Sequence, residues 1–213
     1  MKGRKLVEKK VTEFCQELAS ESPAPGGGSV AALSGALAAS LASMVCRLTV
    51  SKKKFTAVEE EMRVVMEGAD TVRQTLLKLV EEDTQAYEAV MDAYKLPKGT
   101  SDERAARERA VQDALKKATG VPLEVAKQAT AVLGFALRAA QRGNPNAVTD
   151  AGVCALVARA AVEGAILNVK VNLESIEDEG MVAETRRVSE KIRSRAAELA
   201  DKVGAEVAAK IGA

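Results

Sequence analysis

The feature that most constrains the fold of this chain is a run without any charged side chain, residues 23–46. The run opens with two prolines and three consecutive glycines, and large apolar residues then recur at helical spacing: Val30, Leu33, Leu37, Leu41, Met44 and Leu48. Alanine, serine and glycine fill nearly all the positions between them. A helix that is apolar on all sides is buried on all sides. The run therefore predicts a central helix over residues 29–48, with Ser29 in the N-cap position.

The loop ahead of this helix has two interpretations. Gly27, Gly28 and Ser29 could present backbone N–H groups to a ligand at the start of the helix. Three glycines would also allow a ligand or a second subunit to approach the backbone closely. Alternatively, the loop is a flexible turn between two helices. It is not a phosphate-binding loop, because the sequence lacks GxxxxGK[ST] and no strand precedes the glycines.

Helical periodicity continues through most of the remaining chain, and no segment is convincing as a strand. We expect helices over residues 5–20, 29–48, 56–94, 100–119, 122–142, 149–173 and 181–211. Gly120 and Pro122 predict a break or kink in the middle of this series. Long helices joined by short loops are typical of an antiparallel helical bundle. The expected fold class is therefore all-α, with one domain over residues 1–213.

Composition restricts the chemistry. The chain has no histidine, which removes His-dependent nucleophilic catalysis and His-based zinc sites, and we expect no metal. Lys plus Arg is 31, Asp plus Glu is 30 and aromatics are 2%, so nucleic-acid binding is not expected. Cys15, Cys46 and Cys154 lack CxxC spacing, which favours reduced thiols in a helical core and a cytoplasmic location. Residues 23–46 are too rich in Gly, Ala and Ser to favour a membrane span.

Asp83 interrupts an apolar stripe of the helix expected over residues 56–94. A buried carboxylate there would need a partner, and burial would raise its pKa toward a value useful for proton transfer. Alternatively, the stripe rotates onto Tyr87, and Asp83 joins Glu81 and Glu82 on a solvated face. Periodicity alone leaves both interpretations open.

Other polar residues offer candidate binding groups. Asn168 and Asn172 are one turn apart, so their amides share a helix face and could bind a polar heterocycle, or could instead bond to neighbouring helices. Asn144 and Asp150 flank a turn, where capping is the ordinary role. The basic run that begins with Lys52 and Lys53 could bind an anionic ligand tail, or could be a solvated turn.

In combination, these segments resemble the formiminotransferase-cyclodeaminase / methenyltetrahydrofolate cyclohydrolase family. The matching segments are 23–32 (PAPGGGSVAA), Asp83 with Ala86-Tyr87, Leu96-Pro97-Lys98, Val121-Pro122-Leu123, Gly143-Asn144, Thr149-Asp150, and Asn168-Val169 with Val171-Asn172-Leu173. They cover about residues 5–180 in order. Ser51 and Thr149 stand where the family pattern has Gly and Ser, and both changes are mild.

The resemblance implies an all-helical homodimer that acts on the one-carbon unit bridging N5 and N10 of tetrahydrofolate, without a metal or redox cofactor. We expect it to hydrolyse 5,10-methenyltetrahydrofolate to 10-formyltetrahydrofolate. Asp83 is the first candidate for the acid/base and Asp150 the second. The substrate-binding candidates are Gly27, Gly28, Ser29, Lys52, Lys53, Asn144, Asn168 and Asn172, with the two lysines assigned to the glutamate tail.

Two alternatives stay open at this point. One is a formiminotetrahydrofolate cyclodeaminase, which closes the formimino compound with loss of ammonia through a similar tetrahedral carbon. The other is a non-catalytic helical folate-binding or interaction protein that retains the fold without the chemistry.

Overall fold

The computed structural model describes residues 5–50 and 52–212. Within these ranges there are helices and no strand, so the all-α prediction is confirmed. The α-helices are α1 (Val11–Leu18), α2 (Gly27–Val50), α3 (Glu59–Tyr94), α4 (Ser101–Arg142), α5 (Val148–Leu173) and α6 (Glu179–Ile211). Short 3-10 helices lie at Leu6–Glu8, Lys53–Val58 and Pro145–Ala147. Ser51 lies outside the described residues.

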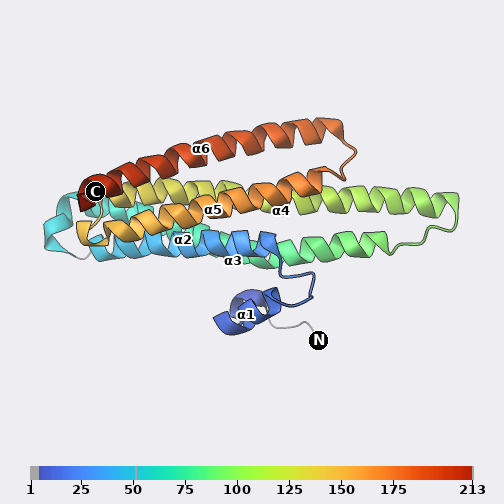
Figure 1. The fold of residues 1–213 in the computed structure, drawn as a ribbon, viewed down its shortest axis with the longest axis horizontal. Coiled ribbons are helices and arrows are strands. Elements are labelled where there is room, and N and C mark those ends of the chain that lie inside the picture. Colours follow the sequence, from blue (N-terminus) through green and yellow to red (C-terminus); the bar gives the residue numbers. More distant parts are fainter. Residues whose placement is uncertain (1–4, 51, 213) are drawn as a thin grey trace.

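Helices α2 to α6 run alternately up and down along one elongated bundle, as Figure 1 shows. Helix α2 packs against α3, α4 and α5, while α6 packs against α4 and α5. The connections between successive helices therefore lie at the two ends of the bundle. The N-terminus of α2 lies beside the later turns of α3 and α5, whereas its C-terminus lies near the start of α3 and the α4–α5 turn.

Helix α2 is the close-packed centre that its composition predicts. Its buried residues are nearly all small and include Ala32, Ala38, Ala39 and Ala42, each fully buried. A Cβ at Gly35 would come within 3.1 Å of the Leu76 side chain on α3, which shows how closely the two helices approach. The small residues thus allow three helices to contact α2 at once.

Several helix boundaries differ from the predictions. The segment predicted as one helix over residues 5–20 is a 3-10 turn followed by the short helix α1. Of the break or kink predicted at Gly120 and Pro122, the break is wrong, because α4 continues through both residues. Helix α5 begins at Val148, so Thr149 lies in its first turn instead of capping it. Likewise, Ser29 lies inside α2, which begins two residues earlier.

The cysteine prediction holds for two residues of three. Cys46 and Cys154 are buried in the core, and burial is the main cause that raises the pKa of their thiols to about 11 and about 12, respectively. Cys15 is exposed on α1, so the expectation of a core position is wrong for it. The cytoplasmic location inferred from these residues stays a prediction.

Two helices, α2 and the segment Pro145–Leu173 that contains α5, are long and apolar enough to cross a membrane by length and composition alone. The core helices of soluble proteins have the same properties. Here the apolar windows of both helices are partly covered by the rest of the bundle, α2 more than α5.

Candidate functional site

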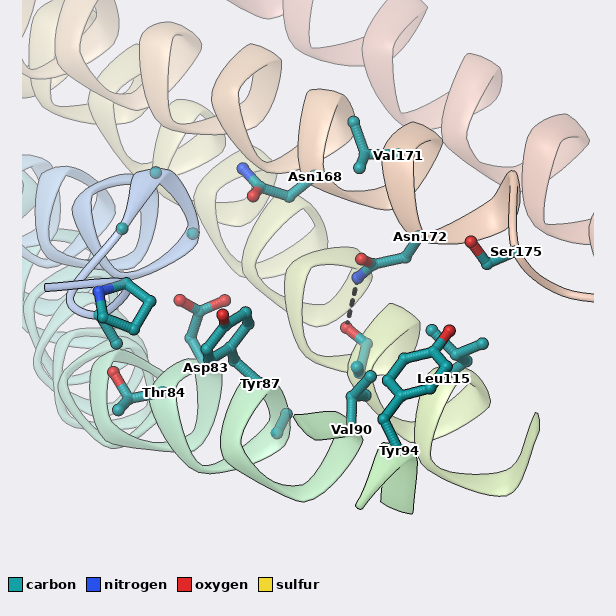
Figure 2. A pocket seen from close by; sticks show the side chains of 17 residues that line it. Asp83, Thr84, Tyr87, Val90, Tyr94, Leu115, Asn168, Val171, Asn172 and Ser175 are labelled. Atoms are coloured by element: carbon teal, nitrogen blue, oxygen red, sulfur yellow. Dashed lines mark hydrogen bonds between the residues drawn. The ribbon is translucent and has the colours of Figure 1, made fainter. Parts of the chain in front are cut away.

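A cavity of about 390 Å³ opens where the N-terminus of α2 meets α3, α4 and α5 (Figure 2). Four helices contribute to it, and the Pro-Gly loop forms one wall. Its polar lining consists of Asp83, Thr84, Tyr87, Tyr94, Asn168, Asn172 and Ser175. This cavity brings together five of the residues selected from the sequence: Gly27, Gly28, Asp83, Asn168 and Asn172.

Asp83 lies directly against the first turn of α2. A Cβ added to Gly28 would overlap the Asp83 carboxylate, so only glycine allows this approach. Oδ2 of Asp83 accepts a hydrogen bond from the Ser29 hydroxyl at 2.9 Å, and the Ser29 backbone N–H also donates to the carboxylate. The first N–H groups of a helix lack partners within it and favour negative charge. The glycine loop therefore positions the carboxylate that lines the cavity.

Two opposing effects act on the pKa of Asp83. Partial burial disfavours the charged form and is the larger effect, so the pKa is raised above the ordinary aspartate value. The hydrogen bonds from the side chain and backbone of Ser29 lower it, and they only partly offset the burial. A carboxyl group with a raised pKa exchanges protons closer to neutral pH, as acid–base catalysis requires.

The hydroxyl of Ser29 can support both protonation states of Asp83. Ser29 is fully buried, and its Oγ lies 2.9 Å from Asp83 Oδ2 and 3.2 Å from the Val80 carbonyl oxygen. When Asp83 is ionised, Ser29 donates to it. When Asp83 is protonated, the carboxyl can donate to Ser29 Oγ, and the hydroxyl proton can turn to Val80. Neither state leaves a buried polar group without a partner at this point.

The two asparagines face the same cavity from α5. Asn168 Nδ2 donates to the Gly164 carbonyl oxygen at 2.9 Å, within its own helix. Asn172 Nδ2 donates across to the Ala118 carbonyl oxygen on α4 at 3.0 Å. Neither Oδ1 has a hydrogen-bond partner among the described residues, and Figure 2 shows both on the cavity side. The asparagine pair therefore offers two acceptors to a ligand.

Both tyrosines of the chain line this cavity, and neither was selected as a binding residue from the sequence. On α3, Tyr87 follows Asp83 by four residues and Tyr94 follows it by eleven, so all three share one helix face. They are 39% and 43% exposed, which leaves ring surface available to a flat ligand. The spacing is readable from the sequence, but only the structure shows that Asp83 and Tyr87 both line the cavity.

The remaining predicted site residues lie at the other end of the bundle. Lys52 and Lys53 are exposed just beyond the C-terminus of α2, and Asn144 and Asp150 flank the start of α5. Helix α2 has 24 residues, so about 35 Å separates its two ends. Within one chain, these four residues do not join the Asp83 cavity.

Asn144 has a structural role at that far end. It is 3% exposed, and its backbone N–H donates to Thr49 Oγ1 at 2.9 Å. Its Nδ2 donates to the Leu48 carbonyl oxygen, and its Oδ1 accepts from the Asn146 backbone N–H. These bonds join the α4–α5 turn to the end of α2, and they match the turn and capping role that the sequence left open.

Known proteins show the same pattern over most of the chain. Residues 10–191 match the family model described as formiminotransferase-cyclodeaminase. The chain belongs to this family. A methenyltetrahydrofolate cyclohydrolase of Methylorubrum extorquens is 40% identical over 211 residues, which cover 99% of this chain and 100% of that protein.

Two further relatives in the formiminotransferase-cyclodeaminase family differ in length and in the reaction for which they are named. The formimidoyltransferase-cyclodeaminase of Rattus norvegicus is 36% identical over 181 residues, which are 85% of this chain but 34% of the rat protein. A crystal structure of formiminotetrahydrofolate cyclodeaminase from Thermotoga maritima superposes with a TM-score of 0.87 at 30% identity, covering 97% of this chain and 99% of that one. The family thus includes proteins named for two reactions.

Proposed function

We propose that this protein is a methenyltetrahydrofolate cyclohydrolase that uses Asp83 as its acid–base group. The single observation that carries the proposal is the Asp83 carboxylate, which lies in a cavity of suitable size with a raised pKa. The full-length similarity to the Methylorubrum enzyme supports the choice of reaction.

The reaction requires only proton transfers around one carbon. Water attacks the cationic methenyl carbon, a C–O bond forms, and the ionised Asp83 accepts a proton from the water. The protonated Asp83 then gives that proton to N5 as the C–N5 bond breaks, and the hydroxyl group loses its own proton as the oxygen becomes the formyl carbonyl. One proton is released overall. A carboxylate beside the cation also stabilises its charge before attack.

The proposal requires Asp83 to be ionised at the first step. Activity should therefore fall as the pH is lowered through the pKa of Asp83, which is raised above the ordinary value of about 3.9. No step requires a metal or redox cofactor, so we propose that none is used, and activity should survive dialysis against a chelator.

The second candidate is formiminotetrahydrofolate cyclodeaminase, favoured by the likeness to the Thermotoga structure. In that direction N10 attacks the formimino carbon, the N10 proton passes to the departing nitrogen, and the C–N bond to that nitrogen breaks. A protonated Asp83 would supply a proton as ammonia leaves. The same carboxyl group could serve either reaction in opposite protonation states.

For the glutamate tail of folate we propose a path along α3. A second cavity of about 460 Å³ shares Tyr94 and Ser175 with the first. The charged residues of its lining are Lys98, Arg104, Arg107, Glu108 and Glu177. Arg107 Nε donates to the Tyr94 carbonyl oxygen at 3.1 Å, and Arg104 Nη1 donates to the Gly99 carbonyl oxygen at 3.2 Å, so both guanidinium groups are held in place.

This path has a suitable length. Asp83 and Tyr94 are eleven residues apart on α3, which corresponds to about 16 Å. That distance is comparable to a p-aminobenzoyl-glutamate unit, which would place tail carboxylates near the arginines when the one-carbon bridge is near Asp83. Lys52 and Lys53 would reach the same tail only from a second subunit.

We also propose that the protein is a homodimer that pairs through α2 and α5. The large aliphatic side chains that these two adjacent helices expose are Leu37, Met44, Leu48, Val153, Leu156, Leu167 and Val171. Helical spacing places them in one stripe on each helix.

Light scattering in buffer without detergent should give twice the chain mass, and Leu156→Lys should give a monomer. A wild-type monomer would contradict this proposal.

The deciding experiment supplies purified protein with each folate separately. Loss of the methenyl chromophore from 5,10-methenyltetrahydrofolate, faster than in buffer, is the expected result. Gain of that chromophore with ammonia release from the formimino compound would instead identify a cyclodeaminase. Folate binding without either reaction would indicate the non-catalytic alternative.

A further inference from the structure

Pro122 lies inside α4, where a proline is unusual. A residue at this position would normally donate its N–H to the carbonyl oxygen of Ala118, four residues earlier. Proline has no N–H, and its ring also crowds that carbonyl. Helix α4 nevertheless continues from Ser101 to Arg142, and Pro122 is buried within it. The carbonyl oxygen of Ala118 therefore lacks its usual helical donor.

Asn172 supplies the missing donor from the neighbouring helix. Its Nδ2 lies 3.0 Å from the Ala118 oxygen, and Figure 2 marks this bond at the edge of the cavity. Because a carbonyl oxygen can only accept, the bond also decides which way the amide points. The reverse orientation would set two oxygens against each other. Asn172 Oδ1 consequently faces the cavity on the side of Asn168 and Asp83.

We infer that Pro122 is a positioning residue for substrate recognition: by freeing the Ala118 carbonyl, it holds the Asn172 amide with its oxygen toward the ligand. The inference rests on the proposed function, since it concerns the same cavity. Asn168 is held in a similar way by the Gly164 carbonyl oxygen, at 2.9 Å. The two amide oxygens on α5 and the Asp83 carboxylate on α3 therefore give the cavity three acceptor groups.

The ligand chemistry that fits these acceptors is a flat heterocycle with adjacent N–H donors. The aminopyrimidinone ring of a pterin has such an edge, with a ring N–H beside an exocyclic amino group. A heterocycle with acceptors at that edge would be rejected, because buried oxygens would face each other without a hydrogen. Pro122 thus contributes to specificity without contacting the substrate.

The experiment compares Pro122→Ala with Gly120→Ala. Both changes favour the helix and should raise Tm. Only Pro122→Ala returns a backbone N–H that can donate to the Ala118 oxygen. This N–H would then compete with the Asn172 amide for the same acceptor. A Cβ at Gly120 meets nothing within 4 Å, so this variant is the matched control. We expect KM to rise about 3- to 10-fold in Pro122→Ala, with kcat little changed, and to stay at the wild-type value in Gly120→Ala.

A double-mutant cycle tests the coupling itself. Asn172→Ala should raise KM by a similar factor, and adding Pro122→Ala to it should cause no further rise. Independent, multiplying effects of the two changes would overturn the inference, as would an unchanged KM in Pro122→Ala. If the wild type turns over neither folate, the proposed function fails instead. The two failures are therefore distinguishable.

Discussion

Asparagine side chains lie near both ends of α2, but their hydrogen bonding differs between the two ends. At its C-terminus, Asn144 uses its backbone N–H, Nδ2 and Oδ1 in bonds within the protein. At its N-terminus, Asn168 and Asn172 each use one amide N–H and leave Oδ1 facing a cavity. A buried polar group whose bonds are complete stabilises the fold. A polar group whose acceptor is free beside a cavity can instead accept a hydrogen bond from a ligand.

The largest effect should come from Asp83, one of the two carboxylates that the sequence suggested, and Asp150 serves as its comparison. Asp83→Asn keeps the shape of the side chain but removes the proton acceptor, so kcat should fall by about 10²- to 10⁴-fold. Asp150→Asn, in the first turn of α5 at the other end, should change kcat by less than about twofold. Initial rates of methenyl hydrolysis measure both. Comparable losses in the two variants would break the distinction between the ends.

A smaller loss is expected at the glycine loop. Gly28→Ala places a Cβ where the Asp83 carboxylate lies, so the carboxylate must shift, and kcat should fall by about 10- to 100-fold. Gly134→Ala in α4 is the matched control, because its Cβ meets nothing within 4 Å. Equal kcat in Gly28→Ala and the wild type would show that the position of Asp83 is not critical.

The far end should respond in stability and not in catalysis. Asn144→Ala leaves the Leu48 carbonyl oxygen without this donor, and the free energy of unfolding should fall by about 1–3 kcal/mol. For a chain of this size, the loss lowers Tm by about 2–4 °C per kcal/mol. Asn146→Ala removes an exposed side chain and should leave Tm nearly unchanged. A raised KM in Asn144→Ala would instead connect this residue to substrate.

The sequence was sufficient for much of the fold and for the centre of the site. The uncharged residues 23–46 predicted a helix that others approach closely, and α2 is that helix. Periodicity left two interpretations open for Asp83, and the contact with Gly28 at the cavity shows that it does not face open solvent alone. Pro122 misled the prediction because local rules count its missing N–H, while the Asn172 amide that compensates lies on a different helix, α5.

The sequence pattern assigned Lys52, Lys53, Asn144 and Asp150 to the same site as Asp83. Position in the sequence does not by itself show which end of a bundle a residue occupies. The alternation of helices carries this information. In an up-and-down bundle, the turn after α2 and the turn before α5 lie at the same end. Lys52 and Asn144 flank these two turns, whereas Asp83 lies beyond the middle of α3. Counting the turns along the chain is therefore enough to separate these two residues from Asp83.

The smallest expected effect is on binding of the glutamate tail. The test compares a cationic residue at one end of the bundle with a cationic residue at the other. Arg107→Ala should raise KM about 2- to 10-fold for a polyglutamylated substrate, and less for the monoglutamate, because a rim cation contributes modestly to binding. Lys53→Ala, on the 3-10 turn after α2, is the control and should change neither value if one chain forms the whole site. The reverse result, a loss confined to Lys53→Ala, would mean that a second subunit brings its far end to the tail. In that case the two ends would act together across the dimer, and the four far-end candidates would regain a role in binding.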